Sequence, residues 1–128
     1  MLAATDAARA DAGELAARPV VAIAFYPGCD ASLKANYRAS APLVLMLAEL
    51  DDWTDSGPCI ALGKRAGAEI NVYPGSYHGF DGPSGEVRLR TDVPNGVNAG
   101  RGVHVGANPV ARELAHARLL EVLRSAMK

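Results

Sequence analysis

Two carboxylates and one histidine have the residue types and the spacing that proton transfer needs. Asp51 and Asp52 follow one apolar run, and His78 stands in the turn of "NVYPGSYHGFD" after the next apolar run. A carboxylate beside an imidazole orients the ring and stabilises its protonated form, so the imidazole can take a proton and return it. This chemistry requires elements that bring an acid and His78 together.

Three segments predict the sheet that would do so. Residues 20–26 and 43–48 form continuous apolar runs, which are typical of strands covered on both faces, and residues 69–73 form a third predicted strand. Helices between strands indicate right-handed crossovers, and therefore an α/β fold with a mainly parallel sheet flanked by helices. In such sheets reactive side chains collect at the carboxyl ends of the strands, which places Asp51 near His78.

Helices are predicted on either side of these strands. Residues 2–17 are rich in alanine and other helix formers, and residues 56–66 suit a helix with Ser56 as its N-cap. Asn108, followed by a proline, opens a closing amphipathic helix. Residues 79–106 are rich in Gly, Pro, Asn and Asp without sustained periodicity, so we predict a long surface excursion that is either a lid or a mobile loop.

The length of the chain predicts a single domain. The 128 residues include 13 Lys and Arg and 14 Asp and Glu, for a formal net charge of −1, and the basic residues form no cluster. Neither nucleic acid nor a membrane surface is therefore an expected partner. The sequence has no signal-peptide pattern and no apolar run long enough to span a membrane, so we expect a cytoplasmic protein.

The two cysteines, Cys29 and Cys59, allow two interpretations. They could form a disulfide if folding brings them together, but two is also an ordinary number of thiols in a reducing compartment. The expected cytoplasmic location favours two unpaired thiols, with Cys59 as a small buried apolar residue at a helix start.

Three motifs in order give the chain a family resemblance: "AFYPGC", "LAELDDWTDSGPC" and "YPGSYHGFD". From about Pro19 to the closing helix, they resemble the C-terminal half of the dienelactone hydrolase family, an α/β-hydrolase group that acts on lactones and related esters. The resemblance implies that residues 1–128 are a single partial domain, the C-terminal part of a three-layer α/β-hydrolase fold. It also implies hydrolysis of a small ester or lactone with no cofactor.

The resemblance assigns two catalytic residues by their positions in the motifs. Asp51 stands three residues after Ala48 and matches the triad acid, with Asp52 as the fallback, and His78 stands three residues after Gly75 and matches the triad base. The family usually has glycine at the position of Ala48. A further departure is Asp55, which stands where proline is common. Trp53 and Tyr77 flank the acid and the base and could wall a small apolar acyl pocket.

The third departure concerns the nucleophile. The family places a Cys or Ser in a G-x-[SC]-x-G elbow before the strand at 20–26, and no such motif occurs in this sequence. The resemblance therefore implies a truncated or split family member that is inactive as this chain alone. Cys29 keeps the order of nucleophile, acid and base, but it has no glycine two residues later to form an elbow, so it is only a weak candidate.

Three other functions remain as alternatives. The chain could be a non-catalytic remnant or one half of a split hydrolase, an interaction domain that pairs with itself or with an N-terminal half through the edge of strand 20–26. A metal site could draw ligands from acidic and histidine side chains, but no H-x-x-x-H or C-x-x-C spacing supports it, and we expect no metal. A flavodoxin-like binding module would need a glycine-rich phosphate loop, which the first strand lacks. The metal ligands considered are Asp51, Asp52, His78, Asp81 and His104.

Overall fold

The computed structural model describes residues 18–128, and the helix predicted over residues 2–17 lies outside this part. Its centre is a three-stranded parallel sheet in the order β1-β2-β3, formed by β1 (Ala22–Phe25), β2 (Leu43–Ala48) and β3 (Glu69–Tyr73). All six residues of β2 are buried, because β2 is the central strand and both of its faces are covered. The predicted α/β fold with a mainly parallel sheet is therefore confirmed.

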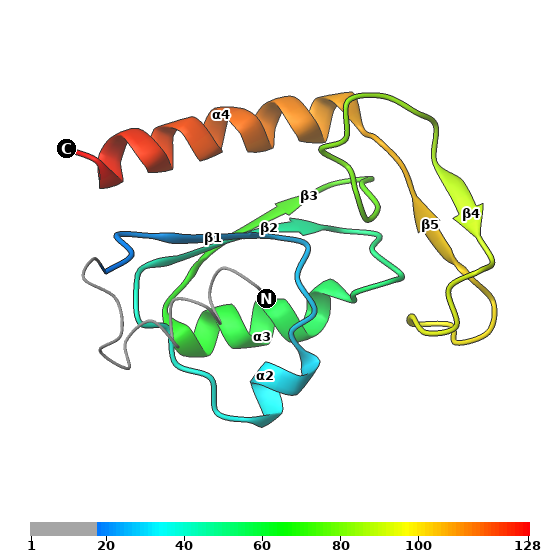
Figure 1. The fold of residues 1–128 in the computed structure, drawn as a ribbon, viewed down its shortest axis with the longest axis horizontal. Helices are drawn as coiled ribbons and strands as arrows, with labels where there is room; N and C mark the ends of the chain where they lie inside the picture. The colour runs from blue at the N-terminus through cyan, green and yellow to red at the C-terminus, as the bar shows by residue number, and fades with distance from the viewer. Residues whose placement is uncertain (1–17) are drawn as a thin grey trace.

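The sheet lies between two layers of helices, as Figure 1 shows. On one face, Leu43, Leu45 and Leu47 pack in a cluster that includes Leu62 of α3 (Ser56–Ala66). On the other face, the alternate residues of β2 pack against α4 (Pro109–Ala126). Each strand residue of β2 thus serves one of two cores, which explains why the run 43–48 is apolar without alternation. A short helix, α2 (Asp30–Lys34), which the sequence did not predict, follows β1.

The helix ends follow the expected capping chemistry with one correction. Asn108 caps α4 by accepting a hydrogen bond from the backbone N–H of Ala111. The N-cap of α3 is Asp55, not Ser56: an Asp55 side-chain oxygen accepts from the backbone N–H of Gly57 at 3.2 Å, and Ser56 is the first helical residue. Asp55 therefore has a local structural role. Among residues 18–128, no helix is both long and apolar enough to cross a membrane.

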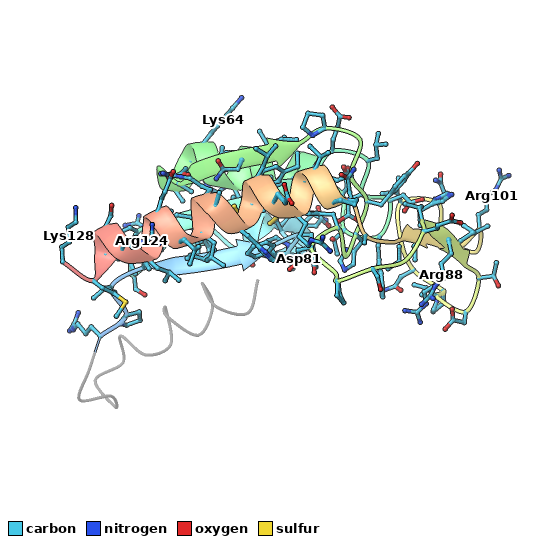
Figure 2. The ribbon with its side chains drawn as sticks, turned by 90° about the horizontal axis from the view of Figure 1, so that it is seen from above. Lys64, Asp81, Arg88, Arg101, Arg124 and Lys128 are labelled. Atoms are coloured by element: carbon cyan, nitrogen blue, oxygen red, sulfur yellow. A yellow bond between two sulfur atoms is a disulfide. The ribbon has the colours of Figure 1, made fainter. Side chains whose placement is uncertain are left out.

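The excursion over residues 79–106 contains a small hairpin. β4 (Arg88–Arg90) and β5 (Val103–Val105) pair as antiparallel strands, and Figure 1 shows them beyond the carboxyl ends of the parallel strands. Figure 2 shows Arg88 and Arg101 at the end of the molecule opposite Lys128. The sequence analysis did not predict these strands, because three-residue strands are too short to give a periodic signal. The hairpin lies at the sheet edge where the site was predicted.

A disulfide joins Cys29 to Cys59, with 5.0 Å between their Cα atoms. The favoured interpretation as two thiols was therefore wrong: the start of α2 and the first turn of α3 lie side by side, although 30 residues separate them in sequence. Structural disulfides are rare in reducing compartments, so the bond counts against the expected cytoplasmic location.

Candidate active site

Asp51 is held by the turn that follows β2. One of its carboxylate oxygens, Oδ1, accepts from the backbone N–H groups of Trp53 and Thr54 at 3.0 and 2.9 Å. This local turn is one that aspartate forms readily, because its short side chain reaches the backbone two and three residues ahead. Asp51 is only 5% exposed. The turn therefore buries the carboxylate while satisfying one oxygen and leaves the other oxygen for a partner.

The turn that carries His78 is tied to the acid loop. Gly75 adopts a φ of +68°, a left-handed conformation that favours glycine. Its backbone N–H donates to the carboxylate of Glu49, and the backbone N–H of Leu50 donates to the carbonyl oxygen of Ser76. The Ser76 side chain is fully buried and donates to the carbonyl oxygen of Tyr73. These bonds fix the two loops against each other at the carboxyl ends of β2 and β3.

Asp51 and His78, the two residues predicted from the sequence, lie within hydrogen-bond distance. Oδ2 of Asp51 is 3.0 Å from Nδ1 of His78. A carboxylate can only accept, so the proton of a neutral imidazole sits on Nδ1 and Nε2 keeps its lone pair. In this tautomer Nε2 can accept a proton from a reacting group.

Thr54 is a site residue that the sequence did not reveal. Its Oγ1 lies 3.1 Å from Oδ2 of Asp51, 3.1 Å from Nδ1 of His78 and 3.0 Å from the carbonyl oxygen of Tyr26. The hydroxyl has one proton to donate and can also accept, so it joins the acid, the base and the end of β1. The sequence feature that could have identified Thr54 is its position three residues after Asp51 in a turn.

Two aromatic rings pack against the imidazole of His78. The ring centroid of Tyr26 is 4.4 Å from that of His78, and the centroid of Trp53 is 4.7 Å from it. Tyr26 adopts a φ of +36°, unusual for a residue other than glycine and typical of backbone held under strain at functional sites. The sequence analysis missed Tyr26, although it directly follows β1 at the same sheet edge as Asp51.

The Tyr26 hydroxyl has a partner of its own, because it donates to Oδ1 of Asp81 at 2.6 Å. Burial raises the pKa of Tyr26 well above its ordinary value, and the hydrogen bond and charge of Asp81 raise it further. The hydroxyl therefore stays protonated and holds the Tyr26 ring against the imidazole. Figure 2 shows Asp81 beside the ribbon near α4. Asp81, considered as a metal ligand in the sequence analysis, is instead engaged by tyrosine.

Asp52, the fallback acid, points to a different histidine. Its Oδ2 lies 2.6 Å from Nδ1 of His104 and its Oδ1 accepts from the backbone N–H of His104 at 2.8 Å. Burial raises the pKa of the Asp52 carboxyl, but the hydrogen bonds from His104 outweigh it and hold the pKa below its ordinary value. Tyr77, proposed as a pocket wall, lies with its ring centroid 5.0 Å from that of His104. The structure thus forms two neighbouring pairs, Asp51 with His78 and Asp52 with His104.

An open cavity of about 350 Å³ is lined in part by Trp53 and Thr54, which contact His78, but neither Asp51 nor His78 is among its lining residues. Cys29 also lines it, but its sulfur is bonded to Cys59 and has no thiol proton to give to a base. A larger hollow of about 480 Å³ lies beside Tyr37 and Arg65, at the other end of α3. Across residues 18–128, no three Cys, His, Asp or Glu side chains are grouped so that they could hold a metal ion.

The comparisons with known proteins give one match. A family model described as the dienelactone hydrolase family matches residues 5–127. The comparison with curated proteins found no match, and the comparison with solved structures found none either.

Proposed function

The chain belongs to the dienelactone hydrolase family, and from this premise we propose that it supplies the acid and the base for hydrolysis of a small ester or lactone. His78 is the general base and then the general acid, and Asp51 orients its imidazole. Trp53 lines the adjoining cavity, where the acyl part of the substrate would lie. No cofactor is needed for this chemistry.

One observation carries the proposal: the 3.0 Å contact between Oδ2 of Asp51 and Nδ1 of His78. The carboxylate is buried, and its other oxygen already accepts two backbone N–H groups. The side chain of His78 is 18% exposed, so the ring is packed yet still open to solvent on one side. This arrangement orients an imidazole for proton transfer at Nε2.

The reaction requires a nucleophile from outside this sequence, which has no G-x-[SC]-x-G elbow. Its hydroxyl or thiol attacks the substrate carbonyl and gives its proton to Nε2 of His78. The tetrahedral intermediate then expels the alcohol oxygen, which takes that proton, and leaves an acyl intermediate. Water attacks the acyl group, again losing its proton to Nε2, and the nucleophile leaves with that proton.

The test uses an activated ester, because an imidazole with a free nitrogen attacks such an ester slowly without a further nucleophile. We would measure release of p-nitrophenolate from p-nitrophenyl acetate by the wild type, His78→Ala, Asp51→Asn and Cys29→Ala. We expect His78→Ala and Asp51→Asn to lower the rate by about tenfold or more. Cys29→Ala removes the disulfide but neither the acid nor the base, so the folded variant should lose less of the rate than His78→Ala.

His116→Ala is the matched control, because His116 lies on α4, away from the site, and is exposed. Its rate should equal that of the wild type. Equal rates in the wild type and His78→Ala would overturn the proposal. A rate that appears only after reduction and is lost in Cys29→Ala would instead make Cys29 the nucleophile.

The second candidate function is an interaction domain, and the edge of β1 favours it. Among residues 18–128, β1 pairs with β2 alone. The backbone N–H groups of Ala22 and Tyr26 donate to carbonyl oxygens of Pro42 and Met46, on the β2 side. Since these groups alternate along a strand, the N–H groups of residues 23 and 25 point to the other edge, where a further strand can add.

Amide hydrogen exchange tests this second candidate. The N–H groups of Ile23 and Phe25 should exchange more slowly as the protein concentration rises if β1 pairs with a second copy. Slow exchange at every concentration would mean that the chain itself covers this edge. Fast exchange at every concentration would exclude self-pairing and leave a different polypeptide as the partner to be tested.

A further inference from the structure

The second acid–histidine pair, Asp52 with His104, engages the strand β5 rather than the cavity. All three oxygen atoms of Asp52 bond to residues of the 79–106 excursion. Oδ1 accepts from the backbone N–H of His104, and Oδ2 pairs with Nδ1 of His104. The carbonyl oxygen accepts from the backbone N–H of Val97 at 2.8 Å. Asp52, the residue next to Asp51, is thus held to the β4–β5 hairpin and its connecting loop by three hydrogen bonds.

The same strand also holds the base. Val105 forms an isolated parallel bridge with His78, and the backbone N–H of Gly106 donates to the carbonyl oxygen of His78 at 3.2 Å. A side chain at Gly106 is excluded, because a Cβ there would lie 2.5 Å from Cα of Val87. Three consecutive residues, His104 to Gly106, therefore contact both the acid loop and the base turn.

We propose that Asp52 and His104 are positioning residues, which fix the separation of Asp51 and His78 through β5. Asp51 and His78 lie on different loops, and a displacement of about 1 Å between such groups is enough to impair catalysis. Because β5 is hydrogen-bonded to Asp52 and forms a bridge with His78, it fixes the distance between the loop of Asp51 and the turn of His78. The catalytic meaning of this role rests on the proposed function, whereas the geometric role does not.

The pair is better suited to positioning than to acting as a second catalytic dyad. The side chain of His104 is 41% exposed, compared with 18% for His78. The aromatic ring that packs against His104 is that of Tyr77. The aromatic rings of Tyr26 and Trp53 and the hydroxyl of Thr54 surround His78 instead. His104 thus lacks the enclosed surroundings that strengthen proton transfer at His78.

The experiment is nuclear magnetic resonance of the imidazoles in the full chain, which contains only three histidines. The readout is the Nδ1 proton of His78, whose exchange with solvent is slow while it bonds to Asp51. In His104→Ala we expect this exchange to become about tenfold faster, the effect of weakening a hydrogen bond to a charged group. His116→Ala should leave the exchange rate at the wild-type value.

A conservative variant separates positioning from general loss of structure. In His104→Asn the amide nitrogen occupies nearly the position of Nδ1 and can donate to Asp52, so slow exchange at His78 should return. Asp52→Asn removes the negative charge that His104 binds, so it should raise the exchange rate of the His78 Nδ1 proton as His104→Ala does. This comparison also serves if His104→Ala does not fold.

An unchanged His78 exchange rate in folded His104→Ala or Asp52→Asn would overturn the proposal. Failure of the proposed hydrolase function looks different. In that case the His78 signal would respond to these variants as expected, while His78→Ala would have no effect on ester hydrolysis.

Discussion

At the scale of residues, the candidate site depends on short polar side chains that bond to nearby backbone. Asp51 reaches the N–H groups of Trp53 and Thr54, and Thr54 in turn reaches back to the carbonyl oxygen of Tyr26. The Thr54 hydroxyl contacts the acid Asp51, the base His78 and the carbonyl oxygen of Tyr26, which follows β1. Its loss should therefore affect both stability and the orientation of His78.

Replacing this hydroxyl by a methyl group tests its contribution. Thr54→Val keeps the shape of the side chain but leaves the carbonyl oxygen of Tyr26 without its donor. We expect the free energy of unfolding, measured by urea denaturation, to fall by about 1–2 kcal/mol. Thr54→Ser is the matched control, since it keeps the hydroxyl, and it should lose less. A greater loss in Thr54→Ser than in Thr54→Val would show that the methyl group, not the hydroxyl, stabilises the site.

At the scale of elements, α4 is fixed to the sheet by packing and by one ion pair. The guanidinium of Arg118 on α4 makes two hydrogen bonds of 2.7 Å with the carboxylate of Glu69 at the start of β3. Chiefly through these bonds, the pKa of Glu69 is lowered to about 2. Because the folded state then binds the Glu69 proton more weakly than the unfolded state, this contribution to stability is present at neutral pH and lost in acid.

This pair predicts how stability depends on pH. In the wild type the contribution of Glu69 is complete above its ordinary pKa of 4.5 and disappears as the pH falls through about 2. In Arg118→Met most of it should be absent at every pH. The difference in urea midpoint between the wild type and this variant should therefore shrink as the solution is acidified from neutral pH. Arg124→Met, a change at an exposed residue on the same helix, should show no such convergence.

At the scale of the whole molecule, the disulfide links the connections that follow β1 and β2. Cys29 and Cys59 are both buried in the core on the α3 face of the sheet. Closing a loop between residues 30 positions apart restricts the unfolded chain and so raises the free energy of the unfolded state. The bond also keeps the end of β1, with Tyr26, close to the acid loop.

Reduction should therefore destabilise the protein by about 2–4 kcal/mol. The measurement is the urea midpoint with and without a thiol reductant, under conditions in which the reduced chain cannot reoxidise. The double variant Cys29→Ala/Cys59→Ala should have a lower urea midpoint than the oxidised wild type, and the reductant should not change it. Equal midpoints for the oxidised and reduced wild type would mean that the bond contributes nothing to stability.

The sequence by itself determined the parallel sheet, the bounds of β2 and β3, and the cap of α4, because these follow from local apolar runs and short-range capping. It also predicted that Asp51 and His78 would meet, since both follow strands that end at one sheet edge. The acid loop and the base turn could be placed in this way because each follows directly from its strand.

Only the tertiary structure decided which partners meet across long separations. The Cys29–Cys59 bond, the contact of Thr54 with Tyr26, and the pairing of Asp52 with His104 join residues 28 to 52 positions apart. Nothing in a local pattern distinguishes His104 in a three-residue strand from a histidine in a mobile loop. Such pairings depend on how the layers and the hairpin pack together, and a single sequence carries no direct signal of that packing.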